Sequence, residues 1–200
     1  MYSEIVGSRA QGRSQVEAFI RDHYWCAYGA ILETYPERIF TLYSESGRPV
    51  AAAGLRTEAD GFFSAAYLDQ PLESAAAGAM MAPVTRASLL EICHLVSISS
   101  HAVFPLMAGI LTYGRDEGFA CGLFTATSRL RRIFDRLGVP FTAVAPATSE
   151  SLTNPETWGS YYDTDPWVCL MPNPSEMPER LFPRCTKVAQ LQAQEAALHG

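Results

Sequence analysis

The pattern of apolar and polar positions predicts a helix and then a hairpin at the start of the chain. Apolar side chains recur at helical spacing after Ser14, which can cap a helix that ends near Gly29. Segments 38–44 and 49–57 are strand-like, and the turn residues ESGR between them predict a hairpin. The small residues AAAG in the second strand imply that another part of the chain packs closely over them.

The strongest strand signal lies near the middle of the chain. Residues 89–99 read LLEICHLVSIS, a nearly continuous apolar run that is typical of a strand covered on both faces. Before it, residues 62–74 are expected to be extended up to a break at Pro71. The segment 75–87 is rich in alanine, methionine and glycine and shows no clear period, so it predicts no particular element.

The second half of the chain continues the alternation of helices and strands. A helix follows residue 99, with Pro105 expected in its first turn and Gly118 at its C-terminal end. The remaining elements are a buried strand at 120–127, an amphipathic helix at 128–138, and strands at 141–145 and 165–171. This order predicts an α/β fold in which a mixed β-sheet has helices on both faces.

Length and composition favour a single domain. A chain of 200 residues with 48% hydrophobic residues can form one well-packed core. We expect a flexible N-terminal arm at 1–12, one domain at 13–171, and a proline-rich tail at 172–200 that can form a short helix.

Charge and cysteine usage argue against several classes of function. The net charge of −6 disfavours nucleic-acid binding as the main activity. Five cysteines without a CxxC pair are typical of free thiols in a reducing compartment, and no apolar stretch reaches the roughly 18 residues needed to span a bilayer. The sequence therefore predicts a cytoplasmic protein without a membrane span. The four histidines lack metal-ligand spacing, so we expect no metal site.

A carboxylate in the middle of the apolar run 89–99 is the first candidate for chemistry. Glu91 needs a cationic or hydrogen-bonding partner, because an unpaired buried carboxylate costs several kcal/mol. Arg56, at the end of the strand 49–57, can reach Glu91 if the two strands are neighbours. The pair can simply fix the strand register. Alternatively, it orients an amine acceptor, or Glu91 removes the amine's proton, directly or through water, during attack on a thioester.

The second candidate, His94, raises a geometric question. In a regular strand Glu91 and His94 point to opposite faces, so they converge on one site only if a bulge lies between them. Without a bulge, His94 is a core histidine whose hydrogen bonds are satisfied. Cys93 shares a face with Glu91 in a regular strand, which permits an acyl-cysteine route as an alternative to inert burial.

Two threonines lie where ligands usually bind in α/β sheets. Thr125 and Thr127 stand at the C-terminal end of the strand 120–127, ahead of a helix. They can hydrogen-bond a substrate or a pantetheine arm. Thr127 or Ser128 can instead serve as the cap of the following helix.

The segment WGSYYDTDPW supplies aromatic candidates. Trp158 and Tyr161 can form the wall of an acyl pocket, and Tyr162 can protonate a departing thiolate. Gly159 allows a tight approach of another part of the chain. Core and loop packing accounts for the same aromatic residues equally well.

Four stretches resemble the thermostable-hemolysin family over about residues 16–170. They are GLRTEADGFFSAAYLDQPLE, LLEICHLVSIS, LFTATSRLRRIFDRLGVPF and WGSYYDTDPWV, of which YLDQPLE and WGSYYD are the most specific parts. That family looks like a branch of the fold shared by GNAT (acyl-CoA N-acyltransferase-like) enzymes and acyl-homoserine-lactone synthases. The resemblance therefore implies a GNAT-like sheet, an acyl-transfer scaffold despite the family's name, and a bulge near His94.

The synthases give a second comparison. Their pattern of a small-residue strand ending in arginine is similar to AAAGLR with Arg56, and their Glu-x-x-Arg is similar to the segment from Glu91 to His94. Since His94 stands in the place of the arginine, the synthases' methionine-derived substrate is not carried over. The helix start SSHAVFPLMAG lacks the glycine loop with which GNAT enzymes cradle the pyrophosphate of coenzyme A.

The missing glycine loop favours a donor carried on an acyl carrier protein, as in the synthases, although coenzyme A remains an alternative. No permanently bound cofactor is expected, only an acyl-phosphopantetheine thioester as co-substrate. Arg129, Arg132 and Arg136 form a row on the polar face of the helix 128–138 and can steer an acidic carrier. An ordinary solvated face explains the same row.

Three hypotheses follow for the function. The first is a cytoplasmic N-acyltransferase that acts on a thioester and a small amine. The second is a membrane-active or lipid-binding protein in keeping with the family's name, which the lack of a strongly basic amphipathic helix disfavours. The third is a non-catalytic ligand-binding member of the fold.

Overall fold

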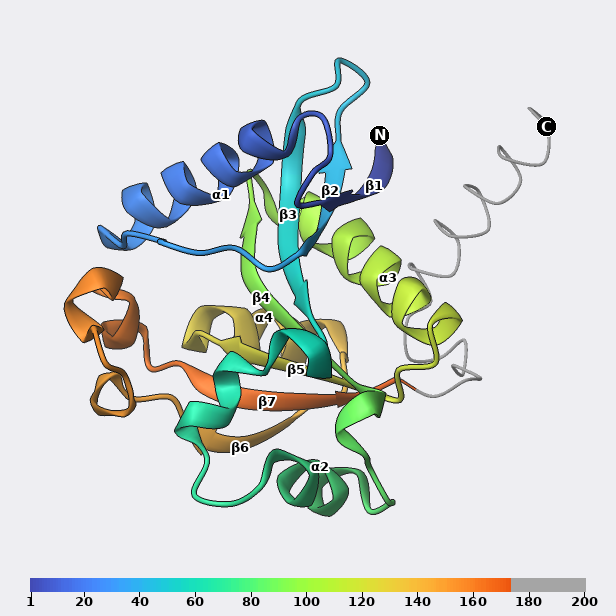
Figure 1. The fold of residues 1–200 in the computed structure, drawn as a ribbon, viewed down its shortest axis with the longest axis vertical. Coiled ribbons are helices and arrows are strands. Elements are labelled where there is room, and N and C mark those ends of the chain that lie inside the picture. Colours follow the sequence, from blue (N-terminus) through green and yellow to red (C-terminus); the bar gives the residue numbers. More distant parts are fainter. Residues whose placement is uncertain (174–200) are drawn as a thin grey trace.

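The computed structural model describes residues 1–173, apart from the side chain of Leu137 (Figure 1). Its centre is a seven-stranded sheet in the order β1-β2-β3-β4-β5-β7-β6. The strands are β1 (Tyr2–Gly7), β2 (Arg38–Tyr43), β3 (Pro49–Arg56), β4 (Leu89–Ser97), β5 (Cys121–Ala126), β6 (Thr142–Pro146) and β7 (Trp167–Pro172). Neighbouring strands are antiparallel except β4 and β5, which are parallel, so the sheet is mixed as predicted.

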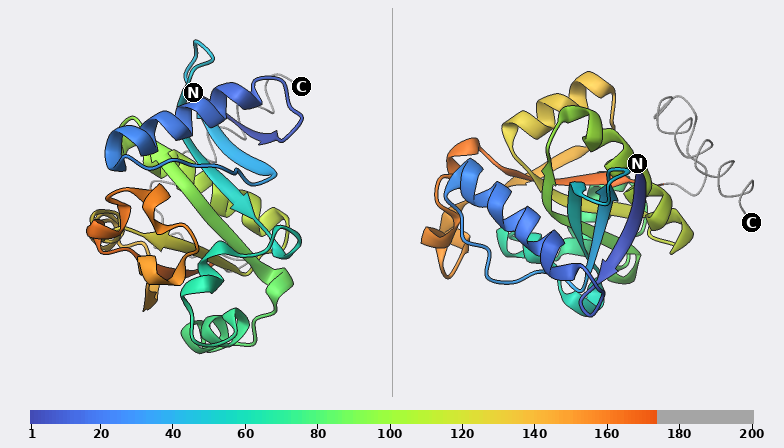
Figure 2. Two further views of the ribbon diagram at one scale, coloured as in Figure 1. Left: turned by 60° about the vertical axis from the view of Figure 1, so that its left-hand side comes forward. Right: turned by 90° about the horizontal axis from the view of Figure 1, so that it is seen from above.

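Helices cover both faces of the sheet, in agreement with the prediction (Figure 2). The α-helices are α1 (Arg13–Tyr28), α2 (Leu72–Met80), α3 (Ser100–Asp116) and α4 (Ser128–Leu137). The 3₁₀ helices are η1 (Glu58–Asp60), η2 (Phe63–Tyr67), η3 (Arg86–Ser88), η4 (Ser149–Ser151), η5 (Pro155–Trp158) and η6 (Tyr161–Thr164). Helices α3 and α4 share one apolar cluster with the sheet, whereas α1 and α2 pack on the other face.

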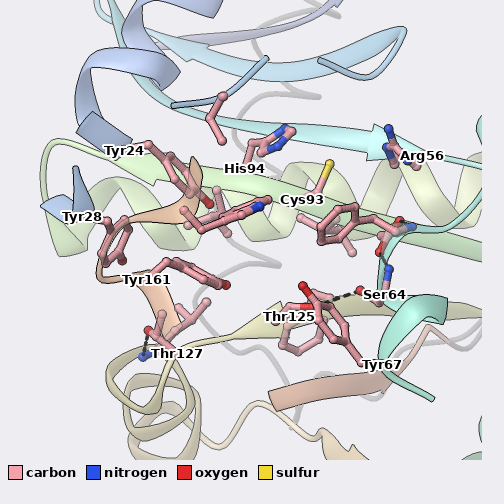
Figure 3. A pocket seen from close by; sticks show the side chains of 18 of the residues that line it. Tyr24, Tyr28, Arg56, Ser64, Tyr67, Cys93, His94, Thr125, Thr127 and Tyr161 are labelled. Atoms are coloured by element: carbon pink, nitrogen blue, oxygen red, sulfur yellow. Dashed lines mark hydrogen bonds between the residues drawn. The ribbon is translucent and has the colours of Figure 1, made fainter. Parts of the chain in front are cut away.

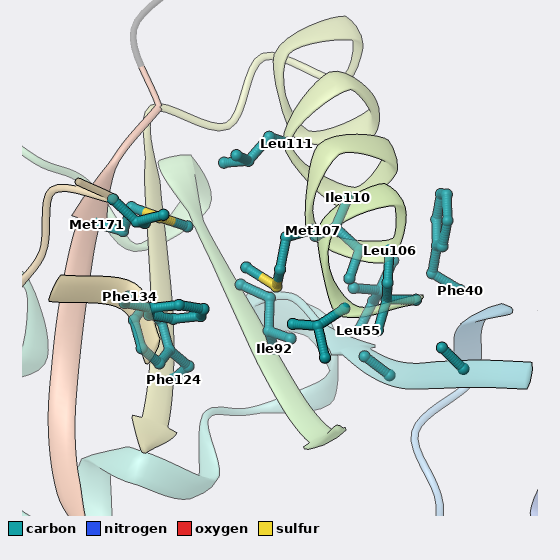
Figure 4. Packing of buried hydrophobic residues seen from close by; sticks show 14 of the residues in the cluster. Phe40, Leu55, Ile92, Leu106, Met107, Ile110, Leu111, Phe124, Phe134 and Met171 are labelled. Atoms are coloured by element: carbon teal, nitrogen blue, oxygen red, sulfur yellow. The ribbon is translucent and has the colours of Figure 1, made fainter. Parts of the chain in front are cut away.

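The larger core lies between the sheet and helices α3 and α4 (Figure 4). Small residues allow close contact there and on the opposite face. At Gly109 of α3, an added Cβ would overlap the buried ring of Phe40, and at Gly54 it would lie 2.5 Å from the Pro36 side chain. The close packing over the small-residue strand is thus confirmed.

The structure corrects several sequence-based predictions. Residues 1–12 are not a loose arm, because β1 pairs along its length with β2. As an edge strand with mostly exposed residues, β1 has too weak an alternation to be recognised. Residues 62–74 are not extended: they form η2 and, directly after Pro71, the start of α2. A proline suits a helix start, so Pro71 marks a beginning rather than a break.

The third correction concerns Pro105, which is the sixth residue of α3 and therefore lies in its second turn. Helix α1 follows the prediction at its C-terminal end, where Gly29 adopts the left-handed conformation, but its N-cap is Gly12 rather than Ser14. Of the predicted tail, only Pro172 and Asn173 belong to the described residues; 174–200 lie outside them.

A bulge in β4 is the feature that creates the site. Ala52 of β3 pairs with Val96, and Gly54 pairs with Cys93, so β4 contains one residue more than β3 over this interval. His94 adopts a left-handed conformation with φ 50° at this point. The bulge implied by the family resemblance is therefore present.

Beyond the bulge, β4 separates from β5. The parallel pairing of these strands ends with Ile92 opposite Phe124, and the rest of β5 pairs only with β7 on its other side. Figure 1 shows the two strands diverging from this point. A gap in the middle of the sheet is the result.

Candidate active site

A cavity of about 630 Å³ occupies the gap between β4 and β5 (Figure 3). Its lining has two different halves. On the face of α3 and α4 the wall is apolar, formed by side chains such as Val103, Met107 and Phe134. On the face of α1 it is aromatic and polar, with the side chains of Tyr24 and Tyr161 directed into it.

Glu91 lies on the cavity wall but is only 1% exposed. Its two carboxylate oxygens accept hydrogen bonds of 2.7 Å from the backbone N–H groups of Phe63 and Ser64. These amides belong to the start of η2, where N–H groups have no partner within the helix. Burial raises the pKa of Glu91 above its usual value, although the hydrogen bonds from Ser64 and Phe63 and the charge of Arg56 act in the opposite direction.

Arg56 is the direct cross-strand neighbour of Glu91, as the sequence suggested. Within the described chain, however, the two side chains form no ion pair. The carboxylate is already engaged by two amides, so the expected Arg56–Glu91 contact is replaced by backbone hydrogen bonds. The guanidinium lines the cavity and makes one long hydrogen bond of 3.5 Å, to the carbonyl oxygen of Gly61.

The bulge brings His94 to the same cavity as Glu91. The imidazole lies between the rings of Tyr24 and Tyr35, at centroid distances of 6.0 and 5.8 Å. Its Nδ1 atom is buried and has no hydrogen-bond partner among the described residues. Burial, assisted by the charge of Arg56, lowers the pKa of His94 to about 4, so the ring is neutral near pH 7.

Cys93, which precedes His94 in β4, also lines the cavity. Burial raises the pKa of its thiol well above the usual range, and the charge of Glu91 adds to this effect. A thiol in this environment is protonated near pH 7, which argues against the acyl-cysteine route.

The two candidate threonines both contribute to the lining. The hydroxyls of Thr125 and Ser64 are 3.0 Å apart, which links β5 to the segment that holds Glu91. The hydroxyl of Thr127 accepts a hydrogen bond of 3.3 Å from the Leu130 amide and so caps α4. Thr127 therefore serves as the cap of α4, as one of the two sequence-based alternatives predicted.

The aromatic candidates divide into two groups. Trp158 and Tyr161 line the cavity, whereas Tyr162 lies behind it and forms a 2.6 Å hydrogen bond with the hydroxyl of Tyr67. Tyr67 itself faces the cavity. Burial raises the pKa of both phenols in this pair.

Gly159 makes the tight approach that the sequence suggested. It has φ 51°, and an added Cβ would overlap the carbonyl oxygen of Tyr28 at the end of α1. The amide of Ser160 donates a 2.8 Å hydrogen bond to that same oxygen. The segment that carries Trp158 and Tyr161 is thereby fixed against α1.

The arginine row lies on the outer face of α4. Arg129, Arg132 and Arg136 are exposed, and Arg129 also reaches the cavity lining. None of the three has an ion-pair partner within residues 1–173. Arg131 points elsewhere and binds Asp165 at 2.7 Å.

Sequence reasoning missed Tyr67, Ser64 and Tyr24 as parts of the site. Tyr24 was assigned only to the apolar stripe of its helix, a periodicity that does not distinguish a core residue from a cavity residue. Tyr67 lies in YLDQPLE, a motif specific enough to draw attention to it. Ser64 and Phe63 act through backbone amides, which leave no signal in the side-chain pattern.

Between residues 1 and 173, no cluster of histidine, cysteine, aspartate and glutamate has the arrangement needed to hold a metal ion. Over the same range, every helix is too short or too polar to cross a bilayer.

Comparison with known proteins identifies both family and fold. A family model described as thermostable hemolysin matches residues 6–175. No curated protein matches the chain. Among solved structures, the acyl-homoserine-lactone synthase LasI is 8% identical, with a TM-score of 0.63 over 90% of this chain and 94% of LasI.

Two further structures are similar. FeeM, an N-acyl amino acid synthase from uncultured soil microbes, is 14% identical, with a TM-score of 0.60 over 87% of this chain and 96% of FeeM. The CoA-dependent acyl-homoserine-lactone synthase MesI is 15% identical, with a TM-score of 0.58 over 94% of each chain. These similarities confirm the predicted GNAT-like fold.

Proposed function

The chain belongs to the thermostable hemolysin family, and from this membership and the geometry of the site we propose that it is a cytoplasmic acyltransferase, which moves an acyl group from a thioester to a small amine. The observation that supports this most strongly is the carboxylate of Glu91, buried and held by two amides on the wall of the cavity between β4 and β5. A shielded carboxylate beside an open cavity suits general-base catalysis.

The proposed reaction forms a C–N bond and breaks a C–S bond. The amine nitrogen attacks the thioester carbonyl carbon, and Glu91 takes the nitrogen's proton directly or through a water molecule. The sulfur leaves as a thiolate and then receives this proton, which restores the Glu91 carboxylate. Because burial raises its pKa, the Glu91 carboxylate is a stronger base than an exposed one.

Other groups on the wall stabilise the reacting atoms in this proposal. The neutral imidazole of His94 hydrogen-bonds the substrates, and the hydroxyl of Tyr67 hydrogen-bonds the departing sulfur. Tyr162 acts through Tyr67, to which it is bonded, rather than directly. A phenol with a raised pKa keeps its proton, so the pair contributes hydrogen bonds and Glu91 supplies the proton.

The backbone of β4 can bind the carbonyl oxygen of the thioester. After Ile92, the β4 backbone has no strand partner on the side of β5. N–H groups that face this gap are suited to stabilise the negative charge that develops on the oxygen. The acyl chain then lies in the apolar half of the cavity, beside Met107 and Phe134.

An acyl carrier protein is the donor that the surface favours. Arg129, Arg132 and Arg136 present three exposed guanidinium groups, and Arg129 also lines the cavity. Carrier proteins are acidic around the phosphopantetheine arm, so this row can orient one with its arm directed into the gap. Coenzyme A thioesters are the alternative donor.

The proposal is tested by incubating the purified protein with acyl carrier and acyl-CoA thioesters and a panel of amines while thiol release is followed. We expect amine-dependent release, and a loss of about 10²- to 10⁴-fold in the Glu91→Gln variant, the range typical of a general base. The exposed residue Glu117 provides the control variant Glu117→Gln, which should react normally.

Two other results would contradict the proposal. Absence of thiol release with every donor and amine would favour the non-catalytic ligand-binding alternative. Lysis of red cells by low concentrations of the protein, unchanged in Glu91→Gln, would favour the membrane-active alternative instead.

A further inference from the structure

The aromatic and polar half of the cavity, called the acceptor half below, contains two opposite charges that do not pair with each other. Arg56 and Glu91 are cross-strand partners, and such residues lie only about 5 Å apart at their Cα atoms. Their side chains nevertheless do not pair with each other. Glu91 is turned to the amides of Phe63 and Ser64, and both it and Arg56 line the cavity. Neighbouring groups of opposite charge that remain separate are complementary to a zwitterion.

The guanidinium of Arg56 has unused hydrogen-bonding capacity. An arginine carries five N–H donors, and within residues 1–173 the Arg56 side chain makes one hydrogen bond, of 3.5 Å, to the carbonyl oxygen of Gly61. Nearby Asp60 is already engaged by Thr57 and by Arg38, which lies 3.6 Å away. A ligand carboxylate would supply the bidentate partner that this guanidinium lacks.

The opposite end of the acceptor half is an aromatic wall (Figure 3). The rings of Tyr24, Trp158 and Tyr161 contact one another, with centroids 5.3 to 6.4 Å apart. Tyr24 and Tyr161 are each only 7% exposed, and Figure 3 shows their side chains directed into the cavity. Their rings offer an apolar surface and their hydroxyls offer hydrogen-bonding groups to a ligand in the cavity.

These elements follow one another along the cavity. In Figure 3, Arg56 lies at one end and the tyrosines Tyr24 and Tyr161 at the other, with Cys93 and His94 between them. A ligand that uses all of them has a carboxylate, an adjacent amine and an aromatic ring.

From this arrangement, and on the basis of the proposed function, we propose that the amine acceptor is an α-amino acid with an aromatic side chain. Its carboxylate binds Arg56, its amine faces Glu91, and its ring packs on the wall formed by Tyr24, Trp158 and Tyr161. The ammonium group first loses one proton to water. The neutral amine then attacks the thioester carbonyl carbon, Glu91 takes a second proton from the nitrogen as the C–N bond forms, and the departing thiolate receives that proton as the C–S bond breaks. The products are an N-acyl amino acid and a free thiol.

The test compares three acceptors with the full chain and one reactive acyl thioester. L-Tyrosine has all three features, tyramine lacks the carboxylate, and L-alanine lacks the ring. We expect kcat/KM for tyramine and for L-alanine to be at least about tenfold below that for L-tyrosine, since one charge-assisted contact or one buried ring contributes more than a factor of ten.

Variants of Arg56 isolate the role of the carboxylate. In Arg56→Met, kcat/KM for L-tyrosine should fall by about tenfold more than that for tyramine, because only L-tyrosine has a carboxylate for Arg56 to bind. Arg48 is exposed in a distant turn, so Arg48→Met serves as the matched control and should change neither value. An equal fall for both acceptors, or equal kcat/KM values for both in the unmodified protein, would overturn the proposal.

The outcomes separate this proposal from the proposed function. Thiol release with amines but without preference for the amino acid would leave acyl transfer intact and refute the acceptor class. If no amine promotes thiol release, calorimetric titration with L-tyrosine and tyramine decides: selective binding of L-tyrosine supports the acceptor site, and absence of binding refutes it. If Arg56→Met does not fold, the kcat/KM values for L-tyrosine, tyramine and L-alanine in the unmodified protein still test the proposed acceptor class.

Discussion

At the scale of single residues, the site depends on a carboxylate that the fold buries without giving it a cation. Two backbone amides hold Glu91, but they do not compensate fully for the loss of water, because its pKa remains raised. The ionised form of Glu91 therefore destabilises the folded state, which is the usual cost of a functional buried group.

This raised pKa has a consequence for stability against pH. As the pH falls from neutral, the folded protein takes up a proton on Glu91 before the unfolded chain does. The unfolding free energy of the natural protein should therefore rise relative to that of Glu91→Gln as the pH falls through this window. Urea unfolding of both proteins at several pH values measures the difference. A constant or falling difference would contradict the raised pKa, and Glu117→Gln is the surface control.

The backbone of His94 gives a second prediction. A side chain at φ 50° costs about 1–2 kcal/mol, least for asparagine and most for β-branched residues. We expect His94→Asn to remain folded and to be more stable than His94→Val by about 1–2 kcal/mol in thermal or urea unfolding. Equal stabilities, or a more stable valine variant, would show that the bulge is not formed at this position.

At the residue level, the sequence singles out polar side chains that stand within an apolar run. Glu91 and His94 stand out because they interrupt an apolar run, and both line the cavity. The partners of Glu91 were not predictable, because the amides of Phe63 and Ser64 belong to a segment that pattern reasoning assigned as extended. The expected ion pair between Arg56 and Glu91 is thus replaced by hydrogen bonds from two backbone amides to Glu91.

At the scale of elements, two short segments position the catalytic groups. The segment from η1 to η2 presents its amides to Glu91, and its own geometry is fixed by Asp60, which accepts a 2.8 Å hydrogen bond from the Thr57 amide. The segment from η5 to η6 brings the aromatic wall against the end of α1. Neither segment has the periodicity of a long helix or strand, so their roles could not be predicted from the pattern of apolar residues.

Gly159 tests how the second segment is held. Because an added Cβ would overlap the Tyr28 carbonyl and φ is positive, Gly159→Ala should lower the unfolding free energy by about 2 kcal/mol or more and weaken acceptor binding. Gly78 in α2 has open space around it, so the control Gly78→Ala should be neutral or stabilising by up to about 1 kcal/mol. Thermal unfolding compares the two, and similar effects at both positions would contradict the tight approach.

Long periodic elements were the predictable part of the fold. The hairpin of β2 and β3, the strand β4 and the amphipathic helix α4 appear at the expected places. The edge strand β1 was missed because most of its residues are exposed, and α2 because alanine and glycine carry no period. The bulge followed from family resemblance alone, since no residue type in 89–99 requires it.

At the scale of the whole molecule, the proposed function depends on a break in the sheet. The pairing of β4 with β5 stops at Ile92 and Phe124, and the resulting gap connects an apolar half lined from α3 and α4 to an aromatic half lined from α1. In the proposed reaction, the acyl chain lies in the apolar half, the polar acceptor lies in the aromatic half, and the two meet at Glu91. The arginine row lies on α4, whose Arg129 also reaches the cavity.

The arginine row makes a prediction about the donor. Reversing the charge of Arg132 and Arg136 together, as Arg132→Glu with Arg136→Glu, should raise KM for an acyl carrier thioester by about tenfold at low salt. The KM for a small acyl-pantetheine donor should not change, because neither residue lines the cavity. Arg48→Glu is the control. Steady-state kinetics at two salt concentrations measure this, and equal effects on both donors would contradict carrier docking.

The most direct measurement is a crystal structure with a non-hydrolysable thioether analogue of an acyl-pantetheine. The account predicts that the sulfur lies between β4 and β5, next to Glu91 and the bulge at His94, with the acyl chain directed towards Met107 and Phe134. An analogue bound elsewhere while this cavity stays empty would contradict the central claim.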